Sequence, residues 1–136
     1  MIKKDYILRI VEEFARVLAA ILGLRQGGQL DEALMQTDKA YRGMLDVDPV
    51  VLKSVSLDQL LDYLQNEKEF DRYYLKMIAE LLFEEGMIYH ELGDPVMSRN
   101  VLEKAKLLIG YLMDNDATFS FDWYEKIHEI DQVLEG

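Results

Sequence analysis

The chain contains no cysteine, only two prolines and no long run of purely apolar residues. The lack of cysteine excludes disulfide scaffolds, thiol nucleophiles and cysteine-ligated zinc, and makes the reducing cytoplasm the expected compartment. Charges at Arg9, Glu12 and Arg16 interrupt the first apolar stretch, and the uninterrupted run 17–24 is too short to cross a bilayer. No small-residue cleavage site follows that run, so we expect no signal peptide.

Positive charge is also scarce. The 136 residues include 26 Asp and Glu against 15 Lys and Arg, which gives a formal net charge of -11. A surface of this sign repels phosphate backbones and anionic lipids, so we expect neither nucleic acid nor membrane as a partner. The length fits one domain, whose core should need no metal or cofactor for its stability.

Apolar residues recur with helical periodicity along almost the whole chain, and no segment alternates with the period of a strand. The pattern predicts five long helices and two short ones. The long helices are expected at residues 5–24, 29–45, 70–92, 95–112 and 121–134, and the short ones at 49–54 and 56–65. Brief connections between them favour antiparallel neighbours.

Turn and capping residues define the boundaries of these helices. Gly28 and Gly93 are expected to end helices, because glycine leaves helical dihedral angles at the least cost. Asp94 is the expected N-cap of the helix that follows. Ser56 and Gln59 fit a capping box, in which each side chain accepts a hydrogen bond from the other residue's backbone amide.

Two segments of similar character align when the sequence is shifted along itself by 65 residues. The aligned pairs are Val17 with Leu82, Leu24 with Tyr89, Gly28 with Gly93, Ala33 with Ser98 and Ala40 with Ala105. Each segment has large residues on a first helix, a glycine at the turn and small residues on a second helix. Small residues allow the two helices of a hairpin to approach closely.

The second segment resembles the tetratricopeptide repeat (TPR), whose pattern of large residues, glycines and small residues occurs at the same spacings. The matching residues are Leu82, Gly86, Tyr89, Gly93, Ser98, Leu102 and Ala105. In the first segment, Ile21 stands where the repeat has glycine and Thr37 where it has phenylalanine. The N-terminal sequence, with Asp5-Tyr6-Ile7-Leu8-Arg9 after Met1-Ile2, is similar to small bacterial TPR-like proteins.

The resemblance implies an all-α, TPR-like superhelix of antiparallel helix hairpins in one domain, residues 1–136. It comprises a hairpin (5–45), an irregular middle unit (46–69), a second hairpin (70–113) and a C-terminal capping helix (120–134). Ser120 is the expected N-cap of that last helix. The alternative is an unrelated helix bundle whose glycines happen to share this spacing.

In TPR proteins the first helix of each hairpin lines a concave groove, and the resemblance therefore implies where such a groove lies in this chain. The corresponding residues are Leu18, Leu22, Arg25, Phe83, Glu84, Met87, His90 and Glu91. Members that bind C-terminal carboxylates use Asn where this chain has Ala19 and Glu84, so that activity is not implied. An apolar floor with acidic rims suits a short apolar or basic peptide. We therefore expect a non-catalytic scaffold that binds a protein or peptide.

Signatures of catalysis are few. Glu125 and His128 could face one metal ion from the last helix, but the second such pair that a di-metal bundle needs is missing. The sequence contains neither a phosphate-binding loop nor a hydrolase motif. The pairs Glu12-Glu13 and Glu84-Glu85 are expected to be solvated, because charged residues mostly stay exposed. We expect no enzyme activity and no metal, with a metal-dependent enzyme as the alternative.

Self-association is the second functional hypothesis. The C-terminal half of the first helix is apolar nearly all round, and such a helix is usually buried on more than one side. A homodimer through the first or last helix would bury it. The aromatic cluster Phe119, Phe121, Trp123 and Tyr124 either covers the end of the core or anchors a partner.

Overall fold

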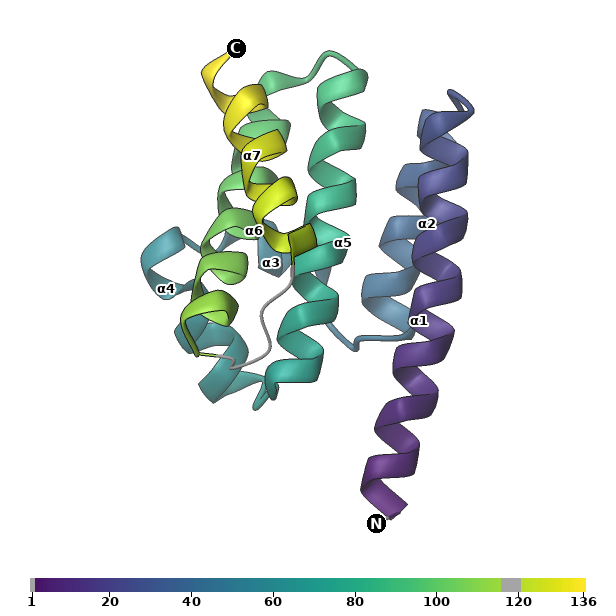
Figure 1. Ribbon diagram of the computed structural model, residues 1–136, viewed down its shortest axis with the longest axis vertical. Helices are drawn as coiled ribbons and strands as arrows, with labels where there is room; N and C mark the ends of the chain where they lie inside the picture. Colours follow the sequence, from purple (N-terminus) through teal and green to yellow (C-terminus); the bar gives the residue numbers. More distant parts are fainter. Residues whose placement is uncertain (1, 116–120) are drawn as a thin grey trace.

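The computed structural model describes residues 2–115 and 121–136, and over these residues the chain is all-α (Figure 1). The seven α-helices are α1 (Ile2–Gln26), α2 (Leu30–Gly43), α3 (Pro49–Ser54), α4 (Leu57–Asp62), α5 (Arg72–Glu91), α6 (Pro95–Asn115) and α7 (Phe121–Glu135). A short π-helical segment, η1 (Tyr63–Glu67), continues α4. The prediction of an all-helical chain is confirmed for this part of the molecule. None of the helices in the described ranges is long and apolar enough to cross a membrane.

The long helices pack as antiparallel hairpins. Helices α1 and α2 form one hairpin, α5 and α6 form the other, and α7 packs against α6 and α5 (Figure 1). Helix α5 therefore lies in the centre, between α1 and α2 on one side and α6 and α7 on the other. This position explains why its apolar residues, unlike those of α1, are buried almost all round.

The turns of the two hairpins have the same backbone geometry. Gly28 and Gly93 both have φ of 79°, a left-handed value that strains any residue with a Cβ. The amide of Gln29 donates to the Leu24 carbonyl at 2.9 Å, and at the equivalent point of the second hairpin the amide of Asp94 donates to the Tyr89 carbonyl at 2.9 Å. The prediction that these glycines end helices is confirmed.

Helix boundaries differ from the predictions at several points. The predicted cap at Asp94 is confirmed, because its Oδ1 accepts a hydrogen bond from the Met97 amide at 3.1 Å. The predicted capping box is wrong. The Ser56 side chain makes no capping bond, since the Gln59 amide donates instead to the backbone carbonyl of Ser56 at 3.1 Å. Helix α6 continues to Asn115, beyond its predicted end, and Ser120 lies outside the described residues.

The start of α5 is also later than predicted. Asp71 caps this helix, with its Oδ1 accepting hydrogen bonds from the amides of Tyr73 and Tyr74 at 3.0 and 3.1 Å. Phe70, the predicted first residue, lies before the cap and stacks on the ring of Tyr74, with ring centroids 5.1 Å apart. A side chain that satisfies two free amides outweighs the helical periodicity that continues upstream.

The two helices of the α5–α6 hairpin approach each other closely at Gly86. A Cβ at this position would overlap the side chain of Leu102, which is fully buried. Ser98 of α6 donates a hydrogen bond from its hydroxyl to the Gly86 carbonyl at 3.0 Å. The small residues at 86 and 98 thus bring the two helices together, as the sequence pattern predicted.

Candidate binding groove

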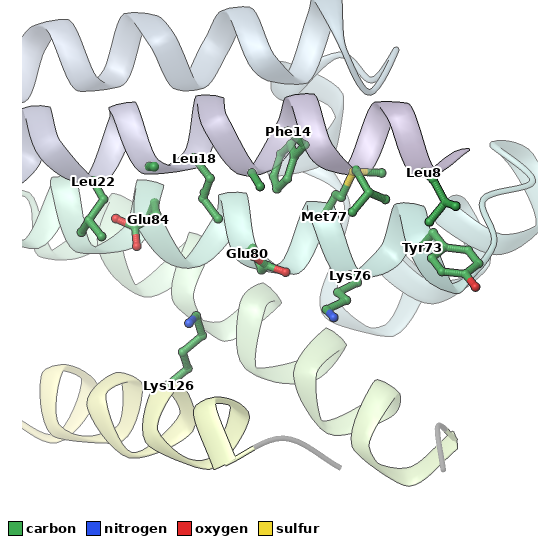
Figure 2. A pocket seen from close by; sticks show the side chains of 13 residues that line it. Leu8, Phe14, Leu18, Leu22, Tyr73, Lys76, Met77, Glu80, Glu84 and Lys126 are labelled. Atoms are coloured by element: carbon green, nitrogen blue, oxygen red, sulfur yellow. The ribbon is translucent and has the colours of Figure 1, made fainter. Parts of the chain in front are cut away.

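A groove runs between α1 and α5, with α7 at its far edge, and encloses about 400 Å³ (Figure 2). It is lined by Leu8, Val11, Phe14, Ala15, Leu18, Ala19, Leu22, Tyr73, Lys76, Met77, Glu80, Glu84 and Lys126. The volume falls within the range of ordinary ligand pockets, but the groove is open along one side. Its shape therefore suits an elongated segment rather than a small enclosed molecule.

The wall formed by α1 is apolar throughout. Leu8, Val11, Ala15, Leu18 and Leu22 recur at intervals of three and four residues. This stripe extends over about 21 Å at 1.5 Å per residue. Leu8 is 46% exposed and Ala15 is also exposed, whereas Val11, Leu18 and Leu22 are half-buried, so the described structure covers this face only in part.

The floor formed by α5 mixes apolar and charged residues. Met77 is buried, and Tyr73 near the start of the helix is 38% exposed. Lys76, Glu80 and Glu84 follow one another at intervals of one helical turn. The charges of the groove are therefore on the α5 and α7 side, opposite the leucines of α1 (Figure 2).

Arg25 of α1 pairs with two carboxylates of α5, one of which, Glu84, lines the groove. Its Nε donates to Glu84 Oε1 at 3.0 Å, and its Nη1 donates to Glu91 Oε2 at 2.9 Å. Burial raises the pKa of Glu84 although the guanidinium of Arg25 acts in the opposite direction. The acidic rim that the resemblance implied is thus neutralised at both of its predicted carboxylates.

Glu85 forms a separate buried cluster behind the groove. It is 2% exposed, accepts a hydrogen bond from the Tyr41 hydroxyl at 2.9 Å and forms an ion pair with the Lys53 amine. Burial raises the pKa of the Glu85 carboxyl and raises that of Tyr41 well above its ordinary value. The expectation that Glu84 and Glu85 are solvated is wrong, because partners on α1, α2 and α3 compensate the cost of burying them.

Three further charged side chains line the edge of the groove nearest α7. The Lys76 amine lies 5.9 Å from the centre of the Trp123 ring, and the Lys126 amine lies 5.4 Å from the centre of the Phe83 ring. Glu80 lies between the two lysines (Figure 2). Among the described side chains, those of residues 5–115 and 122–136, these three form neither a direct ion pair nor a hydrogen bond. Both lysines instead contact aromatic rings and act electrostatically on Glu80.

The structure brings some of the predicted groove residues together and separates others. Leu18, Leu22 and Glu84 line the groove, and Arg25 joins them through its bond to Glu84. Phe83 is only 4% exposed and packs beneath Lys126 of α7. The remaining predicted residues, Met87, His90 and Glu91, lie further along α5 and do not line the groove.

Several groove residues were not among those predicted. Leu8 and Val11 belong to the same periodic stripe as Leu18 and could have been found by extending it towards the N-terminus. Lys126 could not, because its place depends on how α7 packs. That packing involves an ion pair between Lys106 and Asp131 at 2.6 Å, which local periodicity does not encode.

The residues considered for metal chemistry are on the surface of α7. Glu125 and His128 are both exposed, beside Tyr124, Glu129 and Gln132. In the part of the chain that the structure describes, no three His, Asp or Glu side chains converge in a way that could hold a metal ion. Nothing beyond the spacing of the pair supports a metal centre there.

The chain was compared with known proteins, and no family model, no curated protein and no solved structure matches it. By its fold it is a small all-helical protein built from antiparallel hairpins.

Proposed function

We propose that this chain is a non-catalytic protein-interaction module with TPR-like stacking, and that its groove binds a helical segment of a partner protein. The observation that carries the proposal is the partly uncovered apolar stripe of α1, which has the three-and-four spacing of a helix–helix contact. A helix laid beside this stripe would bury exposed Leu8 and the parts of half-buried Leu18 and Leu22 that still contact water.

The stacking of the first helices supports the TPR-like part of the proposal. Leu18 of α1 lines the groove shared with α5, while Phe83, its equivalent in the aligned second segment, packs beneath α7. Leu18 of α1 thus faces α5, and the equivalent Phe83 of α5 faces α7, so each position faces the next helix of the stack α1, α5, α7. The matching turns at Gly28 and Gly93 point to the same repeated arrangement.

The size of the groove favours a helical partner segment. The stripe from Leu8 to Leu22 covers about four helical turns, roughly the average length of a helix in globular proteins. The exposed Ala15 and Ala19 carry short side chains, which lets a second helix approach closely. An amphipathic helix would fill this space with its own apolar face.

Self-association is a second candidate, favoured by another face of α1. Ala20 is exposed, whereas Glu85, at the equivalent position of α5, contacts Tyr41 of the neighbouring hairpin. The corresponding face of α1 has no neighbouring hairpin in the described structure. A second copy of the chain could cover it.

Two adjacent alanines provide the test. Both Ala19 and Ala20 are exposed, but only Ala19 lines the groove. We expect Ala19→Glu to reduce the capture of a partner from cell lysate at least tenfold, and Ala20→Glu to leave it unchanged. Thermal unfolding of both variants should match the unmodified protein, since neither side chain is buried.

The opposite pattern would contradict the proposal. If capture survives Ala19→Glu but is lost in Ala20→Glu, the partner binds the face of α1 that carries Ala20 rather than the groove. Light scattering at several concentrations then tests self-association, and a strict monomer of 15.9 kDa would rule it out.

A further inference from the structure

The two sides of the groove differ in chemistry. The α1 side presents the leucines and alanines of the apolar stripe, whereas the opposite side presents Lys76 of α5 and Lys126 of α7 (Figure 2). A helix held between them contacts apolar side chains along one flank and amines along the other. The charges that it carries on the second flank therefore decide how well it binds.

Both lysines are prepared for an anionic group. Each amine lies over an aromatic ring, Trp123 for Lys76 and Phe83 for Lys126, which holds the extended side chain at the groove edge without neutralising its charge. Arg25 differs, because Glu84 and Glu91 already neutralise it. Neither lysine forms a direct ion pair among the described side chains, although Glu80, which lies between them, interacts electrostatically with both.

We propose that the partner segment is an amphipathic helix with acidic side chains on the flank that faces Lys76 and Lys126. This inference rests on the proposed function, which supplies the helix. It revises the expectation of a basic peptide, because that expectation relied on Glu84 and Glu91 and Arg25 neutralises both.

Glu80 limits where the acidic side chains can lie. It occupies the floor between the two lysines and lacks a hydrogen-bond donor in the described structure. A partner carboxylate directly above it would meet a like charge, while one nearer to either amine would not. The nearby Asp122 and the net charge of -11 also repel a strongly acidic segment. The acidic residues of the partner are therefore few and lie near the lysines.

A pair of synthetic peptides tests this inference. Both are rich in alanine, carry leucines at intervals of three and four along one face, and are long enough to match the apolar stripe of α1. One carries Glu on the adjoining flank and its twin carries Lys at the same positions. Binding is measured by fluorescence anisotropy of labelled peptide. We expect the Glu peptide to bind roughly three- to tenfold more tightly, as one exposed ion pair at Lys76 and one half-buried ion pair at Lys126 would give.

Matched variants assign the preference to the lysines. The double variant Lys76→Gln and Lys126→Gln should abolish the difference between the peptides, whereas Lys39→Gln, an exposed lysine on α2, should leave it unchanged. Glu80→Gln should tighten binding of the Glu peptide. Circular dichroism of each variant establishes that the helices are retained.

Each contrary result has its own meaning. Equal binding of the two peptides, or tighter binding of the Lys peptide, overturns the acidic flank but leaves groove binding intact. If neither peptide binds, both this inference and the proposed function fail. A dimer that neither peptide dissociates would show that a second copy occupies the groove and would likewise overturn the inference.

Discussion

The two hairpins have similar turns but place a large and a small residue on opposite helices. In the α5–α6 hairpin the first helix carries the small residue, Gly86, and the second carries the large one, Leu102. At the equivalent positions of the α1–α2 hairpin, the first helix carries Ile21 and the second carries Thr37, and both are buried. Exchanging a large and a small residue between two facing helices conserves volume, so one backbone arrangement tolerates both solutions.

The two first helices also differ in which residues they bury. Ala19 and Ala20 of α1 are exposed, while Glu84 and Glu85 at the equivalent positions of α5 are 6% and 2% exposed. This is the reverse of what residue polarity alone predicts. The carboxylates are buried because α5 is central and its neighbours supply Arg25, Tyr41 and Lys53. Position in the stack, rather than local sequence, decides burial here.

The largest expected effect comes from placing isoleucine, the residue at position 21 of the α1–α2 hairpin, at the equivalent position Gly86 of the α5–α6 hairpin. Gly86→Ile should lower the free energy of unfolding by about 3 kcal/mol, because its side chain would overlap buried Leu102. Adding Leu102→Thr, which reproduces the Ile21 and Thr37 pair, should recover part of the loss. Urea unfolding of the single and double variants measures both effects.

A control for this prediction is Gly110→Ala on α6. No atom lies within 4 Å of a Cβ at that position, so the helix should gain up to about 1 kcal/mol. If Gly86→Ile is as well tolerated as Gly110→Ala, the two helices do not meet closely at Gly86.

The next effect probes the similarity of the turns. Gly28→Ala and Gly93→Ala should each cost about 1 to 2 kcal/mol, because both residues have φ of 79° and neither has an atom within 4 Å that a Cβ would touch. The loss of stability is then due to backbone strain alone. Gly→Asn at either position should therefore cost much less than Gly→Ala. Unequal losses in thermal or urea unfolding would show that the turns differ in ways their backbone does not reveal.

The smallest effect concerns a third pair of equivalent positions, exposed Ala15 and half-buried Glu80. Burial raises the pKa of Glu80, an effect that the nearby Lys76 and Lys126 oppose. The folded state therefore keeps this proton to a higher pH than the unfolded state. The resulting stabilisation is complete below the ordinary carboxyl pKa and is lost as pH rises through the raised value.

Glu80→Gln removes this pH dependence. We expect the variant to be roughly 0.5 kcal/mol more stable than the unmodified protein at pH 7, with a smaller difference near pH 4.5. Urea midpoints over this range measure the difference. The assignment fails if the variant is less stable at pH 7 or if its advantage grows as the pH is lowered.

Much of the fold could be predicted from the sequence because helices leave a local signature. The spacing of Leu18 and Leu22 predicted both the helix and one side of the groove, and Gly28 and Gly93 predicted the turns. These properties depend on residues only a few positions apart.

The rest depends on contacts between distant residues. Nothing near Glu84 in the sequence indicates that Arg25 will neutralise it, since the two are 59 residues apart. Lys126 is in the groove only because α7 packs against α6, where the Arg99 guanidinium also donates to the Leu134 carbonyl at 2.8 Å. The charges of the candidate site therefore became apparent only from the packing of the helices.

The Arg25 bridge also has a mechanical consequence. It fastens α1 to α5 at one end of the groove, near the hairpin turn, whereas the far end of α1 carries exposed Leu8. The end of α1 that carries Arg25 is therefore tied directly to α5. Buried Phe14 and Ile21 also hold α1 in the core, so a small displacement of the segment before Phe14 would move Leu8 while the groove near Leu22 keeps its width.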